Sequence, residues 1–262
     1  MKFPRRRSPI VATALLIGAL TVVGGGYAVA TSVQPAQAAV GADGQTQIEQ
    51  GKRLYLEGCS SCHGMQAQGS ANGPTLVGVG AAAVDFQVGS GRMPMAAPGA
   101  QAPAVDPPRY DDDQIAAMAA YVASLAPGPA IPTEEQLDYA HADAARGGEL
   151  FRINCSQCHQ AAGQGGALTQ GKYAPNLMGA EPKEIYEAMV TGPQNMPVFS
   201  NAQLADKDKK DIIAYVSALQ ESPNPGGLSL GRLGPVSEGM FLWTAIFGAL
   251  IAVAVWIGIK AR

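Results

Sequence analysis

The sequence has few aromatic side chains for its length. Phe, Trp and Tyr make up 6% of its 262 residues, which is little for a chain that must fill its cores with side chains alone. A large apolar cofactor would compensate, because a small domain can fold around such a group. The length allows one large domain or two small ones.

Basic residues are scarce in the middle of the chain. Positions 31–238 contain all 21 acidic residues but only 12 of the 18 basic ones, a net charge of −9. Such a surface repels nucleic acid and anionic lipid, so neither is expected to bind there. A partner with a basic docking face would suit it, although negative charge also serves solubility alone.

Charge is absent from residues 239–259. As a helix this stretch would be about 31 Å long, enough to cross a bilayer. Trp243 and Trp256 lie near its ends, where amphipathic rings favour the membrane interface, and Lys260 and Arg262 follow at once. We therefore predict a C-terminal transmembrane helix with a cytoplasmic C-terminus. A buried core helix is the alternative.

Residues 1–38 combine a basic start with an apolar run at 9–30 and a small-residue site at Ala36-Gln37-Ala38. This pattern fits either a cleaved secretory signal or an N-terminal transmembrane anchor. We favour the anchor, because the run exceeds the usual signal core of about 7–15 residues. Either reading places the residues that follow on the extracytoplasmic side of the cell membrane.

Cysteine and histidine are rare and concentrated. All four cysteines and two of the three histidines fall in two C-x-x-C-H motifs. The flanking sequences also repeat, since GKRLYLEGCSSCH returns as GGELFRINCSQCH 96 residues later. Such self-similarity predicts two domains of one kind.

Three further short sequence motifs recur in the same order in both copies of the repeat. GPTLVG corresponds to APNLMG, GRMP to QNMP, and YVASL to YVSAL. In each copy acidic residues precede the closing segment, as at a helix N-terminus, and apolar residues then recur at helical spacing. With no strand-like alternation, we predict an all-α fold: domains at 45–127 and 141–221, a linker at 128–140, and a tether at 222–238.

C-x-x-C-H is typical of covalent haem c attachment. The cysteine sulfurs form thioethers with the haem vinyl groups, and the histidine ligates the iron. We expect two haem c groups, held by Cys59, Cys62 and His63 and by Cys155, Cys158 and His159. A thioredoxin-like dithiol would need a βαβ pattern, and a four-cysteine zinc site needs more closely spaced pairs. Two disulfides would leave both histidines unexplained.

Methionine is the expected second axial ligand, since it suits electron transfer. Met93 and Met196 each precede a proline in the same slot of the repeat, so we predict that they ligate iron. Met95 and Met178 are the alternatives. His141 lies among polar residues after the linker and is expected to be exposed.

Two other pairs have expected structural roles. Met118 and Met189 fall on helical stripes and are expected in the cores. Pro74 and Pro175 follow the two motifs. They are either plain loop prolines or positions where a backbone carbonyl accepts the imidazole N–H and raises ligand basicity.

Each half resembles a class I cytochrome c domain, on CSSCH…GPTLVG…GRMP…YVASL and CSQCH…APNLMG…QNMP…YVSAL. The whole layout is similar to the dihaem cytochrome c subunits of actinobacterial cytochrome bcc complexes. The resemblance implies a subunit of a menaquinol–cytochrome c reductase, a translocase. Electrons would pass from a Rieske iron–sulfur subunit, beside cytochrome b, through both haems to a terminal cytochrome oxidase. The chain itself would be a carrier without a substrate site.

Two other functions stay open. The chain could be a dihaem subunit of a terminal oxidase or of an extracytoplasmic dehydrogenase. It could also be a dihaem peroxidase, which needs an open iron site. Residues 96–108, rich in Ala and Pro, depart from the repeat. They are either a docking loop or a tolerated surface insertion.

Overall fold

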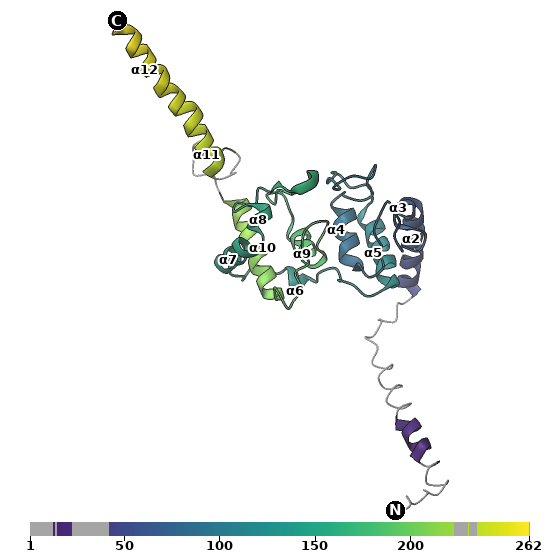
Figure 1. Ribbon diagram of the computed structural model, residues 1–262. Helices are drawn as coiled ribbons and strands as arrows, with labels where there is room; N and C mark the ends of the chain where they lie inside the picture. The colour runs from purple at the N-terminus through teal and green to yellow at the C-terminus, as the bar shows by residue number, and fades with distance from the viewer. Residues whose placement is uncertain (1–12, 14, 23–41, 223–229, 231–234, 262) are drawn as a thin grey trace, which may run out of the picture. The chain divides into compact units, whose positions relative to one another are not determined.

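The computed structural model describes residues 13, 15–22, 42–222, 230 and 235–261 (Figure 1). The chain forms two units, Met1–Thr46 and Gln47–Arg262, and the second contains both motifs. Residues 15–22 are helical, but most of the predicted N-terminal segment 1–38, and much of the tether 222–238, lie outside the described residues.

Short helices dominate the described residues, as the all-α prediction requires. In chain order the elements are α2 (Ala42–Gly58), α3 (Ser60–His63), α4 (Gly80–Gly89), α5 (Asp112–Leu125), α6 (Glu134–Leu137), α7 (Ala144–Asn154), α8 (Ser156–His159), β1 (Gly166–Ala167), η1 (Thr169–Gly171), β2 (Tyr173–Ala174), α9 (Pro182–Thr191), α10 (Asp206–Glu221), α11 (Pro235–Phe241), η3 (Leu242–Phe247) and α12 (Gly248–Lys260). The antiparallel β1–β2 pair was not predicted, because two-residue strands leave no alternation to detect.

Each half has its own apolar core. In the first, Tyr55 of α2 packs with Val84 of α4 and with Met118 of α5. In the second, Phe151 of α7 packs with α9 and α10, where Met189 lies. Met118 and Met189 are each 2% exposed, which confirms their predicted core positions.

Glycine marks the same helix crossing in both halves. A Cβ atom at Gly51 would overlap the backbone carbonyl of Ala117, and one at Gly147 would overlap that of Asp211. The glycine that opens each sequence repeat therefore lets the first helix of the domain approach the closing helix. Aromatic pairs, Tyr55–Tyr121 and Phe151–Tyr215, each with centroids 5.3 Å apart, pack between the same two helices.

The closing helices begin at the predicted acidic residues. Asp111 is the N-cap of α5, and its Oδ1 accepts a hydrogen bond from the backbone N–H of Gln114 (2.9 Å). In α10, Asp208 Oδ2 accepts from the N–H of Ala205 (3.3 Å). Both contacts satisfy backbone donors that a helix N-terminus leaves free.

Helix α4 packs on α5 and also on α9 of the second half (Figure 1). Asp85 of α4 forms an ion pair with Lys183 of α9. Glu187, one turn further along α9, is 1% exposed and lies close to Asp85. Burial, together with the neighbouring Asp85, raises the pKa of Glu187 to about 9. Polar groups thus lie buried where the two halves meet.

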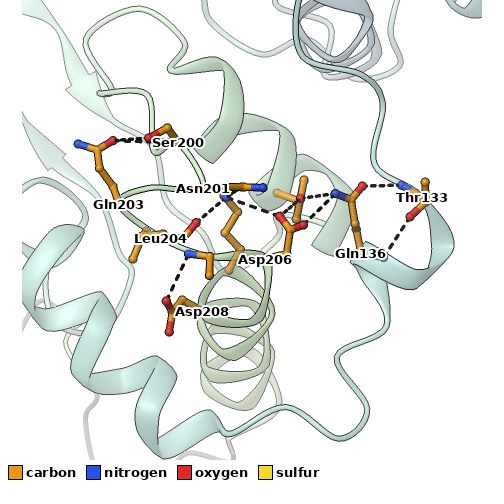
Figure 2. Close-up of polar contacts among 11 residues, drawn as sticks. Thr133, Gln136, Ser200, Asn201, Gln203, Leu204, Asp206 and Asp208 are labelled. Carbon is orange, nitrogen blue, oxygen red and sulfur yellow. Dashed lines mark hydrogen bonds and ion pairs between the residues drawn. The ribbon is translucent and has the colours of Figure 1, made fainter. Parts of the chain in front are cut away.

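The linker is ordered against the second half. Thr133 and Gln136 form a capping box at α6. Gln136 Nε2 then donates to Tyr186 Oη (2.8 Å), and that hydroxyl donates to Asp206 Oδ1 (2.7 Å). Figure 2 shows this chain of contacts running from the linker to the start of α10. The predicted linker 128–140 therefore includes a docked helical turn.

The C-terminal end is a long apolar helical stretch. Ser237–Lys260 spans 24 residues and is long and apolar enough to cross a membrane. Its last basic residue, Lys260, lies over the ring of Trp256, with Nζ 4.8 Å from the ring centroid. The predicted transmembrane helix at 239–259 falls within this stretch.

Candidate haem-binding sites

The first motif lies where α2 runs into the short helix α3. The N–H of Cys59 donates to Tyr55 O (2.8 Å), which continues α2, and the N–H of His63 donates to Cys59 O (3.0 Å). Two cysteines and the histidine therefore share one tight turn. Tyr55 Oη also donates to Gly64 O (2.6 Å), so the core is tied to the end of that turn.

The second motif repeats this arrangement between α7 and α8. The N–H of Cys155 donates to Phe151 O (2.8 Å), and the N–H of His159 donates to Cys155 O (2.9 Å). Phe151 has no hydroxyl with which to bind the turn. Instead Tyr215 Oη of α10 donates to Ala161 O just beyond it (3.2 Å).

Both histidines are oriented by a proline carbonyl. His63 Nδ1 lies 2.7 Å from Pro74 O, and His159 Nδ1 lies 3.0 Å from Pro175 O. These contacts confirm the predicted hydrogen bonds. They fix the tautomer with the proton on Nδ1 and leave Nε2 as the ring nitrogen available to a metal.

Electrostatics favours neutral side chains at the motifs. Burial raises the pKa of the Cys59 thiol to about 11 and that of Cys155 to about 12. A reactive dithiol would favour a lowered thiol pKa, so a thioredoxin-like site does not fit well. Burial also lowers the pKa of His159 against the opposing hydrogen bond to Pro175, which favours the neutral imidazole that binds metals.

A large cavity lies at the second motif. Its empty space is about 1190 Å³ when the part open to solvent is included, and it is lined by Cys155, Cys158 and His159 together with Met196. Apolar side chains of α9 and α10 complete much of the lining. The apolar lining and the donor set of two cysteines, a histidine and a methionine fit a covalently attached haem.

The methionine candidates take different places. Met196 lines the cavity with His159, whereas Met178 is not among its lining residues and contacts the turn at Gly163 instead. In the first half, Met93 packs on the same core cluster as Cys59, and its N–H donates to Gln87 O (2.8 Å). Met95 lies near Gly99, in the segment that departs from the repeat.

Some lining residues were missed by the sequence analysis. Phe86, Arg92 and Gln101 of the first half line the cavity at the second motif, and Lys172 of the second half also lines it. Of these lining residues, only Arg92 could have been suspected from the sequence, because it directly precedes the predicted iron ligand Met93. His141 is exposed, as predicted.

The two halves match families of haem proteins. Residues 48–126 match the family described as "Cytochrome c". Residues 142–216 match the family described as "Cytochrome C oxidase, cbb3-type, subunit III". Cytochrome c domains imply haem c, which agrees with the chemistry of both motifs.

Whole-chain relatives give a narrower family. The chain is 48% identical to the cytochrome bc1 complex cytochrome c subunit of Corynebacterium efficiens, over 98% of this chain and 90% of that one. It is 46% identical to the subunit of the same name from Mycobacterium bovis, over 98% and 93% of the two chains. Since these alignments span both motifs and the apolar C-terminal helix, this chain belongs to the cytochrome bc1 complex cytochrome c subunits, as its resemblance to the actinobacterial complex implied.

Proposed function

We propose that this chain is the dihaem electron-transfer subunit of a quinol-oxidising respiratory complex. Its two halves, 45–127 and 141–221, would each act as one carrier, passing electrons from a Rieske iron–sulfur subunit towards a terminal cytochrome oxidase. The main support is the repeated constellation of two cysteines, a histidine bonded to a proline carbonyl, and a methionine before proline.

The residues of each half have defined roles in this proposal. Cys59 and Cys62 would attach one haem, and Cys155 and Cys158 the other. Each haem, when bound, takes up and releases one electron at its iron. His63 and His159 would ligate iron through Nε2, because the proline carbonyls occupy Nδ1. The carbonyl contact would raise the basicity of the imidazole.

Met93 and Met196 are the proposed ligands on the other side of each iron. A thioether in this position raises the midpoint potential relative to a second histidine and leaves no open site for a substrate. Met93→Ala and Met196→Ala should therefore each open one haem to cyanide or carbon monoxide, measured by optical titration. If neither variant binds the added ligand, the methionine assignment is wrong; rapid cyanide binding by the parent protein would favour a peroxidase.

Membrane attachment sets the proposed location. The stretch Ser237–Lys260 would anchor the chain with Lys260 at the cytoplasmic side, and the haem domains would lie on the extracytoplasmic side. Protease added to right-side-out vesicles should then remove the haem domains, and inside-out vesicles should protect them.

One observation favours a second candidate. Residues 142–216 match a family of oxidase subunits, which suits a dihaem subunit of a terminal oxidase. Purification in mild detergent separates the two functions. Recovery with cytochrome b and an iron–sulfur protein supports the proposal, whereas recovery only with a copper-containing oxidase subunit or a dehydrogenase supports the alternative.

A further inference from the structure

The cavity at the second motif is partly walled by the first domain. Phe86 of α4, Arg92 beside Met93, and Gln101 from the segment 96–108 all line it. These residues come from the domain that contains the other C-x-x-C-H motif. The second site is therefore completed by a neighbouring domain of the same chain.

Direct hydrogen bonds hold this wall in place. Gln101 Nε2 donates to Tyr173 O (2.8 Å), and Gln101 Oε1 accepts from the N–H of Tyr173 (2.7 Å). Gln194 Nε2 donates to the carbonyl of Ala102, which is 3% exposed (3.4 Å). The segment 96–108 thus docks on the second domain beside the cavity, which supports the docking-loop interpretation over a free surface insertion.

Arg92 is a cation of the wall that lacks an acidic partner. Its guanidinium lies over the ring of Phe86, 4.9 Å from the centroid. Among the ion pairs of the described residues, none involves Arg92. Lys172, the other Lys or Arg of the lining, already donates to Asn195 Oδ1 (2.8 Å). A permanently charged guanidinium therefore lines the cavity without an ion pair to a protein carboxylate, although Glu184 belongs to the same lining.

We propose that Arg92 is a haem-binding residue of the second site, pairing its guanidinium with a carboxylate of the haem attached at Cys155 and Cys158. This inference rests on the proposed function. Haem has two propionate groups, and the planar guanidinium fork matches a carboxylate with two parallel hydrogen bonds. Because Arg92 and Met93 are consecutive, the residue that ligates the first iron adjoins the residue that holds the second haem.

The charge of Arg92 has a measurable consequence. A cation near a haem disfavours the ferric state, which has one more positive charge than the ferrous state. Arg92→Gln should therefore lower the midpoint potential of the second haem. Arg92→Lys keeps the charge but not the fork, and should return that potential most of the way to the parent value.

The experiment is a potentiometric titration of the full-length protein in its complex, followed in the α-band and resolved into two components. Met196→His identifies the second haem, because a second histidine lowers its potential. Arg109→Gln is the matched control, since Arg109 is exposed, belongs to the same domain, and does not line the cavity.

The expected result is a downward shift of the second component in Arg92→Gln, larger than any shift of the first, with both components unmoved in Arg109→Gln. The proposal is overturned if the second component stays in place, if only the first moves, or if the control moves the second equally. If Arg92→Gln loses haem, Arg92→Met replaces it in the same comparison, because methionine also removes the charge while keeping most of the side-chain length. A parent protein without haem on the second motif would refute the proposed function itself.

Discussion

The two cytochrome c domains place different residues at the same positions of their closing helices. Aligning YVASL of α5 with YVSAL of α10 sets Ile115 opposite Lys209 and Ala117 opposite Asp211. Ile115 is 4% exposed in an apolar core, while Lys209 and Asp211 are both 0% exposed. The same fold therefore accommodates either apolar or charged side chains at these two buried positions of the closing helix.

Hydrogen bonds explain why charged side chains are tolerated at the buried positions of Lys209 and Asp211. Lys209 Nζ donates to Asn201 Oδ1 (2.5 Å) and to Leu204 O (2.7 Å). Asp211 accepts from Lys207 Nζ (2.7 Å) and from the N–H of Asp143 (2.8 Å). Buried charges with this many partners cost little, whereas removing one partner leaves the others unsatisfied.

The helix crossing is the feature that the two domains share most closely, so its disruption should have the largest effect. Gly51→Val and Gly147→Val should each lower the unfolding free energy of their own domain by about 3 kcal/mol, because the new side chain overlaps a backbone carbonyl. Thermal unfolding followed by circular dichroism measures this. Gly89→Val is the control, since a Cβ there meets nothing within 4 Å; equal losses in all three variants would contradict the shared crossing.

The hydrogen bonds of the buried Lys209 should stabilise the second domain, whereas the first domain has Ile115 at the corresponding position. Lys209→Met keeps the length of the side chain but removes its donors, and should cost about 2–3 kcal/mol because Asn201 and Leu204 O lose their partner. Lys52→Met on the exposed face of α2 should change stability by less than about 0.5 kcal/mol. Denaturant titration of both variants gives the comparison, and equal costs would show that the network adds no stability.

The contact between the domains should weaken as pH rises. The pKa of Glu187, about 9 in the folded protein against 4.5 for an ordinary glutamate, means that the folded state binds the extra proton between these values. Stability is therefore full below about pH 4.5 and is lost as the pH approaches 9, with a loss of about 1–2 kcal/mol between about pH 6 and pH 8.5.

Glu187→Gln tests this pH dependence, because the amide mimics the protonated carboxyl at every pH. The variant should flatten the stability profile measured by thermal unfolding across the same pH range. Glu221→Gln, at an exposed position in the second domain, should keep the slope of the parent. A slope in Glu187→Gln that equals the parent slope would assign the dependence to other groups.

The smallest predicted difference concerns the turn after each motif. Tyr55→Phe removes the 2.6 Å hydrogen bond to Gly64 O and should destabilise the first domain by about 1 kcal/mol. Tyr215→Phe removes the longer, exposed contact to Ala161 O (3.2 Å) and should cost the second domain less. Denaturant midpoints compare the two, and a larger loss in Tyr215→Phe would reverse the expected order.

Local chemistry explains which features could be predicted from the sequence. The repeat, the N-cap at Asp111, the core methionines and the proline carbonyls each depend on neighbouring residues or on helical spacing. Contacts between distant segments left no such pattern. Gln101 reaches Tyr173 across 72 positions, and Gln136 of α6 reaches Tyr186 across 50 positions.

The burial of some polar residues could not be predicted from the sequence either. Lys209 and Glu187 occur on helices with many charged residues, where an exposed face is the ordinary expectation. Their burial follows from partners that only the folded chain assembles, Asn201 for the lysine and Asp85 for the glutamate. The position of Arg92 at the cavity could not be predicted from the sequence either, because it depends on contact between the two domains.

The intact mass of the full-length chain, measured after denaturation and acid extraction, tests most directly whether both halves attach haem. We predict a polypeptide that stays coloured and exceeds the mass of its amino acids by two haem groups, and by one in a variant with Cys155→Ala and Cys158→Ala. A denatured parent chain with the mass of its amino acids alone, or of one haem only, would contradict the account.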